Sequence, residues 1–170
     1  MHLDEEANKA MSKDIKFAQY NIRQTLYPKQ QEVYDDDYDK IIVCICSRRV
    51  GKSELDARLL AKRCLRPDQH CVYINRSFDA AVRQIRKPLE TALEAAGLTS
   101  YEGTIGGGLI TFPNGSQIMI LGNNNAKDID KLRGFSLALV IMDEVGHMRN
   151  MKQIVEEVIE PAMMDYADSQ

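Results

Sequence analysis

Residues 41–53 of the chain read IIVCICSRRVGKS. The first six are apolar and mostly β-branched, which predicts a strand over 41–46 that is buried on both faces. The run then ends in Gly51-Lys52-Ser53 and leads into a stretch over 53–66 with the apolar spacing of a helix. A strand, a loop ending in Gly-Lys-Ser and a helix are the order in which a phosphate-binding loop occurs. The run therefore predicts such a loop, with an exposed basic turn as the alternative.

The residue types of the predicted loop match the chemistry of phosphate binding. Backbone N–H groups at a helix N-terminus cradle phosphate oxygens, a lysine such as Lys52 reaches the β- and γ-phosphates, and a hydroxyl such as that of Ser53 is a ligand for Mg²⁺. The departure from the full G-x-x-x-x-G-K-[ST] pattern is Cys46, which stands where the first glycine belongs. If that position needs a positive φ, a cysteine there costs about 1–2 kcal/mol.

A second motif lies at residues 137–144, which read LALVIMDE. An apolar strand that ends in an acidic pair is what ATPases place opposite the phosphate loop. In that arrangement Asp143 would hold Mg²⁺, usually through water, and Glu144 would orient and polarise the attacking water. Taken alone, the motif also fits a strand that ends in a solvated turn. The phosphate loop upstream, in the order that ATPases use, favours the catalytic interpretation.

A third motif, QTLYPKQ at residues 24–30, precedes the first expected strand. The amide of Gln30 can pair with the donor and acceptor edges of adenine, and the ring of Tyr27 can stack on the base. The alternative is an ordinary turn that enters a helix at Pro28.

The rest of the chain predicts an α/β fold. A short strand is expected over 71–75, and Pro113-Asn114-Gly115 predicts a hairpin between strands 109–112 and 116–121. Helices are expected over 3–20, over 77–87, from Pro88 to near Gly97, and over 151–160, where Pro161 would end the last one. Residues 106–108, three glycines, are interpreted as a flexible turn. Strands alternating with helices predict a P-loop domain: a mainly parallel sheet flanked by helices, with an added antiparallel hairpin.

Composition limits the function classes. A length of 170 residues favours one domain. Apolar runs of five or six residues are far too short to span a bilayer, and the charged residues 1–10 lack the apolar region of a signal peptide, so membrane and secreted proteins are excluded. The net charge of −3 restricts any nucleic-acid contact to a local patch. Arg76, Arg83, Arg86 and Lys87 are interpreted as a solvated face, with contact to DNA phosphates as the alternative. The four cysteines lack C-x-x-C spacing, which indicates free thiols and no zinc site.

The ordered set of motifs resembles the ATPase domain of the large terminase subunit of tailed bacteriophages. The resemblance covers about residues 24–160 and has four parts. These are a Tyr-Pro-x-Gln element at Tyr27–Gln30, an arginine-bearing loop at Ser47–Ser53 without the usual first glycine, the Asn114-Gly115 hairpin, and Leu132-Arg133-Gly134 before the acidic strand. No single motif is specific to the family, but the ordered set is.

The resemblance implies a Mg²⁺-dependent ATPase that drives double-stranded DNA into a phage capsid, in the cytoplasm of the infected bacterial host and without a membrane partner. It implies self-association into a ring and contacts with portal, capsid and small terminase subunit. By position, Gln30 and Tyr27 would contact adenine, and Asp143 and Ser53 would serve Mg²⁺. The triphosphate would be bound by the loop residues Ser47, Arg48, Arg49, Val50, Gly51, Lys52 and Ser53. Glu144, Lys52, Arg48 and Arg133 would be catalytic.

Two of these assignments have open alternatives. Arg133 would reach the γ-phosphate of a neighbouring subunit, where such a residue contributes 10³–10⁵ in rate, or is a surface or capping arginine. Arg48 would contact phosphate or act as a strut for the loop.

The expected organisation is an N-terminal helical segment, 1–23, and an ATPase domain, 24–170. The family's coupling motif and its nuclease domain have no match in the sequence, so we expect a motor domain truncated before both, without nuclease activity. Two other functions remain open. A helicase-like or repair ATPase would usually carry His or Asp where Gly146 stands. A nucleotide-binding module without turnover is the other.

Overall fold

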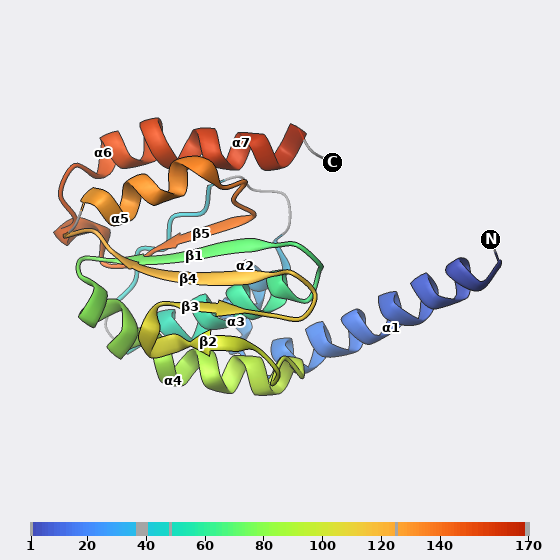
Figure 1. Cartoon of the computed structure of the whole chain (residues 1–170). Coiled ribbons are helices and arrows are strands. Elements are labelled where there is room, and N and C mark those ends of the chain that lie inside the picture. The colour runs from blue at the N-terminus through green and yellow to red at the C-terminus, as the bar shows by residue number, and fades with distance from the viewer. Residues whose placement is uncertain (1, 37–40, 48, 125, 169–170) are drawn as a thin grey trace.

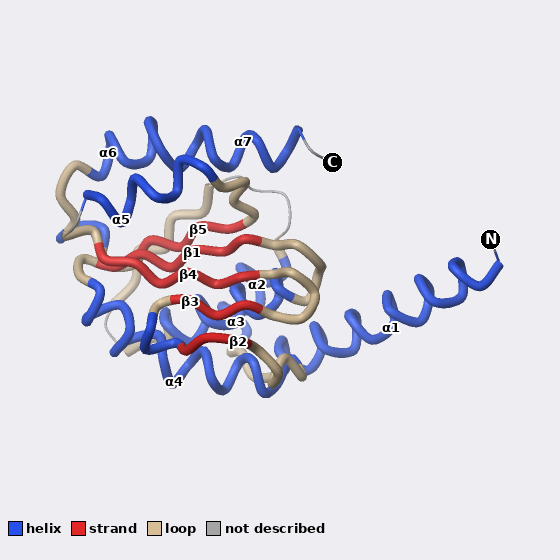
Figure 2. Tube along the Cα trace, in the orientation of Figure 1, coloured by secondary structure: helices blue, strands red, loops and turns tan. Residues whose placement is uncertain are grey.

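The computed structural model describes residues 2–36, 41–47, 49–124 and 126–168. A five-stranded sheet of order β2-β3-β4-β1-β5 lies between two layers of helices (Figures 1 and 2). The strands are β1 His70–Asn75, β2 Glu102–Thr104, β3 Leu109–Thr111, β4 Gln117–Gly122 and β5 Leu139–Met142. The helices are α1 His2–Gln24, α2 Pro28–Asp35, α3 Lys52–Cys64, α4 Phe78–Ala96, α5 Ala126–Asp130, α6 Met151–Ile154 and α7 Glu160–Asp168, with a π-helical turn at Val155–Ile159.

Strand β1 forms the centre of the molecule, pairing in parallel with β4 on one side and β5 on the other. Its side chains alternate between two apolar clusters. Cys71 and Tyr73 pack toward the layer of α3 and α4, whereas Val72 and Ile74 pack toward the layer that contains α7. A strand buried on both faces in this way needs apolar residues at every position, which explains the continuous run over 71–74. The predicted parallel sheet with helices on both faces is confirmed.

The predicted hairpin is also confirmed. Strands β3 and β4 pair antiparallel, with Ile110 opposite Ile118. Gly115 in the turn has a φ of +83°, and a Cβ there would collide with the Asp68 carboxylate, so the turn requires glycine. A third strand, β2, pairs antiparallel with β3. It is followed by the short 3₁₀ turn Ile105–Gly107, with Gly108 as its C-cap, where a flexible turn was predicted. The sequence did not predict β2, whose three residues are all exposed.

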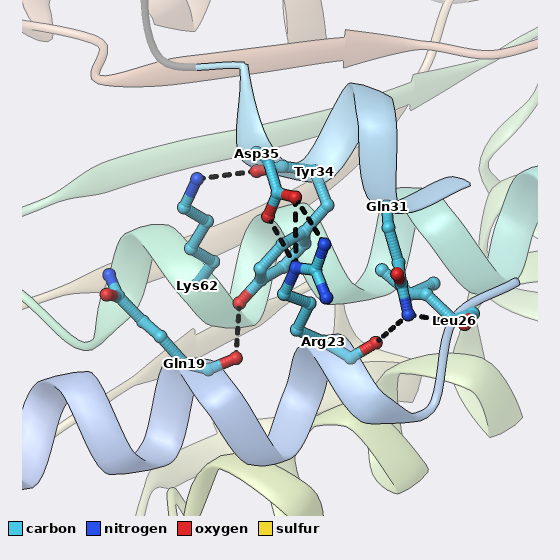
Figure 3. A network of polar contacts seen from close by, with 7 residues as sticks. All are labelled: Gln19, Arg23, Leu26, Gln31, Tyr34, Asp35 and Lys62. Atoms are coloured by element: carbon cyan, nitrogen blue, oxygen red, sulfur yellow. Dashed lines mark hydrogen bonds and ion pairs between the residues drawn. The ribbon is translucent and has the colours of Figure 1, made fainter. Parts of the chain in front are cut away.

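Helix α2 joins the first helix to α3, as Figure 3 shows. Asp35 accepts hydrogen bonds from Arg23 of α1 at 2.7–2.9 Å, and the Tyr34 hydroxyl donates to the carbonyl of Gln19. Lys62 of α3 donates to the carbonyl of Tyr34 and lies over its ring. These contacts anchor the C-terminal part of α1, while the rest of that helix extends away from the sheet (Figure 1).

The predicted strand over 41–46 is wrong. Residues 41–47 have no regular secondary structure, and Ile41, Val43 and Ile45 are 71%, 76% and 94% exposed. Both edges of β1 are occupied by β4 and β5, and none of the five described strands pairs with residues 41–47. An apolar run becomes a buried strand only where neighbouring strands pair with it and helices cover it. The composition of this segment could not show that such pairing is absent from the described sheet.

The helix start predicted at Pro88 and the helix end predicted at Pro161 are also wrong. Pro88 lies inside the single helix α4, and the helical path runs through Pro161. A proline in a helix removes the N–H that would serve the carbonyl four residues earlier. Before Pro161 the chain forms the π-helical turn Val155–Ile159, and Arg133 donates to the carbonyl of Glu157, the one that Pro161 leaves without its helical donor. Such local adjustment lets the helical path continue through Pro161.

In the part of the chain that is described, no helix is long and apolar enough to cross a membrane.

Candidate functional site

A cleft of about 460 Å³ opens where β1 and β5 end and α3 begins. It is lined by Arg49, Gly51, Lys52, Ser53, Glu54, Gln84, Asp143 and Glu144. The first five come from the phosphate loop and the first turn of α3, Gln84 from α4, and the last two from the end of β5. Ligands of α/β proteins bind at this carboxyl edge of a sheet. The structure thus brings together the two halves that the sequence predicted to face each other.

The loop half of the cleft, residues 47–53, has the backbone of an anion site. Gly51 has a φ of +81°, Arg49 has a φ of +66°, and α3 starts at Lys52. Left-handed residues before a helix N-terminus turn backbone N–H groups toward one point, which favours a phosphate. A Cβ at Gly51 would lie 2.6 Å from Nε2 of Gln30, so this position requires glycine. Cys46 is not among the described residues with positive φ, so it costs the loop no strain.

Gln30 ties this loop to α2. Its Nε2 donates to the carbonyl of Gly51 at 2.8 Å, and its Oε1 accepts from the backbone N–H of Tyr27 at 2.9 Å. The amide of Gln30 thus has a partner at each end, whereas the Tyr27 side chain is 74% exposed. The adenine contact expected of both residues stays a prediction.

The basic and hydroxyl groups of the loop half make hydrogen bonds of 3.1–3.4 Å. The Lys52 ammonium donates to the carbonyl of Ser47 at 3.4 Å, and the Ser53 hydroxyl accepts from Nε2 of Gln84 at 3.1 Å. Val50 is half-exposed and lies outside the residues that line the cleft. Arg48 lies outside the described residues.

The acidic half of the cleft, Asp143 and Glu144, is built into the sheet. The N–H of Asp143 donates to the carbonyl of Ile74 at 2.9 Å, and its buried carboxylate accepts from the Tyr73 hydroxyl at 3.0 Å. It also accepts from the Gln84 amide and from the N–H of Glu144. Burial and the neighbouring Asp143 carboxylate raise the pKa of the Tyr73 hydroxyl well above its usual value, so Tyr73 remains a neutral donor.

Glu144 has a left-handed backbone, with φ +55° and ψ +37°, and its side chain is exposed. This conformation costs a non-glycine residue about 1–2 kcal/mol, and such strain is concentrated at functional sites. Its carboxylate forms an ion pair with Arg76, 3.8 Å from Nε to Oε2. The sequence interpretation of Arg76 as part of a solvated face missed this contact, because Arg76 follows β1 and the pairing of β1 with β5 is what brings it to Glu144.

Gln84, which lines the cleft, and Asp56, which does not, carried no sequence signal. Gln84 lies on α4, far along the chain from Ser53 and Asp143, to which its Nε2 donates. Asp56 lies one turn after Ser53 on α3. Burial, together with the charge of Asp143, raises the pKa of Asp56 from 3.8 to about 8, and Lys52 partly opposes the shift. Long-range packing creates both environments, so no local pattern could have shown them.

The donor set fits Mg²⁺ bound together with a nucleotide. No group of three or more His, Cys, Asp or Glu side chains that could hold a metal occurs among the described residues. Mg²⁺ in phosphate sites, however, needs only one or two protein oxygens, because phosphates and waters complete its shell. The Ser53 hydroxyl and the Asp143 carboxylate contact the same amide nitrogen of Gln84, so they are close enough to share one small ligand.

Arg133 lies away from the residues that line the cleft. It donates to Asp130 at 3.2 Å and to the carbonyl of Glu157 at 2.8 Å, and it is paired with the Glu157 carboxylate at 3.6 Å. Within the described chain its contacts are those of a capping arginine. Action on a neighbouring subunit stays a prediction.

The chain is similar in sequence and in fold to known proteins. A family model for the N-terminal part of the large terminase subunit of T4likevirus type matches residues 43–164. The solved large terminase of the thermophilic bacteriophage D6E superposes with a TM-score of 0.61 at 21% identity, covering 88% of this chain and 36% of that one. The large terminase ATPase domain of Thermus phage P74-26 gives a TM-score of 0.63 at 19% identity, covering 84% of this chain and 61% of that one.

A further structure, the D6E large terminase in complex with ADP, gives a TM-score of 0.52 at 20% identity and covers 89% of this chain and 35% of that one. At these identities the likeness concerns the fold, and the chain spans from about a third to three fifths of the length of these proteins. A comparison with curated protein sequences finds no match. The family model covers more than half of the chain, and the chain therefore belongs to the large terminase subunit family, with the fold of the ATPase domains of phage terminases.

Proposed function

We propose that this chain is the ATP-hydrolysing domain of a motor that packages double-stranded DNA into a phage capsid. The observation that carries the proposal is the single cleft in which Lys52 and Ser53 face Asp143 and Glu144. A lysine and helix N-terminus for phosphate, a hydroxyl and a buried carboxylate for Mg²⁺, and a second carboxylate for water are the set of groups that phosphoryl transfer to water requires.

Each half of the cleft has its own task in the proposed reaction. The N–H groups at the start of α3 and the Lys52 ammonium bind the β- and γ-phosphates and neutralise charge that develops during bond cleavage. Bound Mg²⁺ supplies a positive charge on the phosphate oxygens, and Ser53 and Asp143 would hold it. Glu144 accepts the proton of the attacking water, which requires its carboxylate to leave Arg76 and face the γ-phosphate.

The first test is calorimetric titration of Mg·ATP into the wild-type chain and into Lys52→Ala. We expect wild-type binding and a loss of at least about 100-fold in affinity for the variant, because the lysine provides the main charge contact with the phosphates. Lys29→Ala, which removes an exposed lysine of α2 paired with Glu32, is the matched control and should bind normally. Circular dichroism establishes that all three proteins are folded. A folded wild type that binds no nucleotide at millimolar concentration contradicts the proposal.

Turnover is tested with Glu144→Gln, which keeps size and hydrogen bonding but removes the base. We expect binding to persist and the turnover number to fall roughly 10²–10⁴-fold. Binding with no wild-type turnover would support a second candidate, a nucleotide-binding module. The pairing of Glu144 with Arg76 and the exposed, unpaired segment 41–47 favour that candidate for the isolated chain.

The motor part of the proposal rests on the family and the fold. It includes double-stranded DNA as substrate, a ring of subunits in which Arg133 acts on a neighbour, and contacts with portal, capsid and small terminase subunit. Turnover that rises more steeply than linearly with protein concentration, and rises further with double-stranded DNA, is the expected result. Turnover strictly proportional to concentration, with or without DNA, contradicts the ring.

A further inference from the structure

The side chain of Gln84 lies between the two groups that would hold the cation. Its Nε2 donates to the Ser53 hydroxyl at 3.1 Å and to Oδ2 of Asp143. Neither the phosphate loop nor the acidic strand supplies it, because Gln84 lies on α4, which packs against α3 and β1. One amide nitrogen thus links the loop half of the cleft to the acidic half.

The orientation of this amide is determined by its surroundings. Asn75, which is fully buried at the end of β1, donates from Nδ2 to Oε1 of Gln84 at 3.3 Å. The opposite orientation would place two N–H₂ groups against each other and the Gln84 oxygen against the Asp143 carboxylate. The amide therefore presents its N–H groups, which carry partial positive charge, to the two oxygens that Mg²⁺ would need.

We propose that Gln84 is a positioning residue that holds Ser53 and Asp143 in a closed arrangement and gives up its place between them when a cation binds. The inference rests on the proposed nucleotide function and deepens it. A cation shared by the two oxygens lies about 2.0–2.1 Å from any oxygen that it binds directly, so it takes the place of the amide nitrogen. Gln84 and the cation thus compete, and the amide contact lowers the apparent affinity of the site for Mg²⁺.

Release of the amide would change contacts beyond the site. The same Asn75 that bonds Gln84 accepts from the N–H of Arg76 through Oδ1 at 2.7 Å, and Arg76 pairs with Glu144. Within α4, Pro88 supplies no N–H for the carbonyl of Gln84, so the turn that carries this residue lacks one of the hydrogen bonds of the helix. Cation binding would therefore change the contacts of α4 and those of Arg76, the residue that pairs with Glu144.

The test measures how ADP binding depends on Mg²⁺ in the wild type, Gln84→Ala and Gln84→Glu. We expect Gln84→Ala to need roughly three- to tenfold less Mg²⁺ for half-maximal ADP binding, because one hydrogen bond to a charged group no longer competes. The Mg²⁺ requirement of each variant is measured relative to its own ADP binding in EDTA. Gln84→Glu is near-isosteric and places a carboxylate beside Asp143, so it should weaken ADP binding in EDTA and steepen the dependence on Mg²⁺.

Gln153→Ala is the matched control, because it also removes an amide that donates to a carboxylate, that of Glu157, and lies outside the cleft. A second readout is the side-chain N–H₂ resonance of Gln84 in NMR spectra, which should shift with Mg·ADP and not with ADP in EDTA. If Gln84 is only a structural strut, both Gln84 variants lose stability and bind ADP more weakly with and without Mg²⁺ by the same factor, which overturns the inference.

The outcomes separate the inference from the function on which it rests. A wild type that binds ADP, with a dependence on Mg²⁺ that the Gln84 variants leave unchanged, overturns the role of Gln84 alone. A folded wild type that binds neither ADP nor Mg·ADP overturns the proposed function, and the role of Gln84 with it.

Discussion

The acidic half and the loop half of the cleft differ in how the fold holds them. Asp143 is buried, its backbone is hydrogen-bonded to β1, and its carboxylate accepts bonds from three groups of the chain. Lys52 lies after an exposed segment, 41–47, and its ammonium makes one 3.4 Å contact with the loop carbonyl of Ser47. The acidic half is thus preorganised by the sheet, and the loop half depends on α3, Gln30 and a ligand for its order. The comparison predicts that equivalent substitutions in the two halves have unequal effects on stability.

The largest expected effect is on turnover, where Lys52→Ala and Asp143→Ala should each lose about 100-fold or more, because the first removes a positive charge from the phosphates and the second removes a ligand of the proposed cation. Their effects on folding should differ. Asp143→Ala leaves the buried Tyr73 hydroxyl without its acceptor and should lower the free energy of unfolding by about 1–3 kcal/mol, whereas Lys52→Ala should leave it unchanged. Urea unfolding measures both, and equal stabilities of the two variants would contradict the comparison.

Asp56 interacts electrostatically with Asp143 in the acidic half and with Lys52 in the loop half. Its substitution should have the next largest effect, on the free energy of unfolding. A pKa raised to about 8 means that native Asp56 keeps its proton between about pH 4 and pH 8, where the unfolded carboxyl, with its pKa of 3.8, has lost it. The native state then binds more protons than the unfolded state, so stability falls as pH rises through this window. Asp56→Asn removes the titration and should be more stable than the wild type by on the order of 2–4 kcal/mol at pH 8, with no difference near pH 4.

Thermal unfolding of Asp56→Asn across that pH range makes the measurement. Asp14→Asn, which changes an exposed carboxyl of α1, is the control and should follow the wild type at every pH. An Asp56→Asn profile parallel to the wild type would show that the carboxyl is solvated and that the two halves do not interact through it.

Gln30→Ala should loosen the loop half and leave the acidic half unchanged. Loss of the bonds to Gly51 and Tyr27 should cost about 1 kcal/mol of stability and weaken binding of ATP and GTP to the same extent. If Gln30 instead leaves the loop to bind adenine, ATP should lose affinity and GTP should not. Calorimetry with both nucleotides separates the two roles.

Arg133→Ala should have the smallest effect on stability, about 0.5–1 kcal/mol, because the pairs with Asp130 and Glu157 are half-exposed and the main loss is the bond to the Glu157 carbonyl. If Arg133 also serves a neighbouring subunit, the variant should lose the steep concentration dependence of turnover as well. A stability loss without any change in turnover would assign Arg133 to capping alone.

The acidic half was predictable from the sequence because strand and chemistry coincide there. Leu137 and Ala138 are buried, the residues of β5 are partly buried against the apolar clusters on the two faces of the sheet, and Asp143 follows them directly. The loop half was predictable in its chemistry, since Gly51, Lys52 and Ser53 lie where the motif places them. Its strand was not, because residues 41–46 have the composition of a buried strand but none of the described strands pairs with them. Gln84 and Asp56 could not be predicted, because packing of α4 and α3 against the ends of the strands creates their environments.

The exposed segment has a consequence for the behaviour of the protein in solution. Residues 41–46 form a short, uncharged, β-branched run without proline, and within the described sheet the outer edge of β5 has no partner. Such a run and such an edge are templates for pairing between chains, including the stacked pairing of fibrils. We therefore expect the protein to lose solubility as concentration and temperature rise even while its core stays folded. The substitution Val43→Lys should keep the protein soluble at higher concentration and temperature, because Val43 is 76% exposed and lies outside the residues that line the cleft.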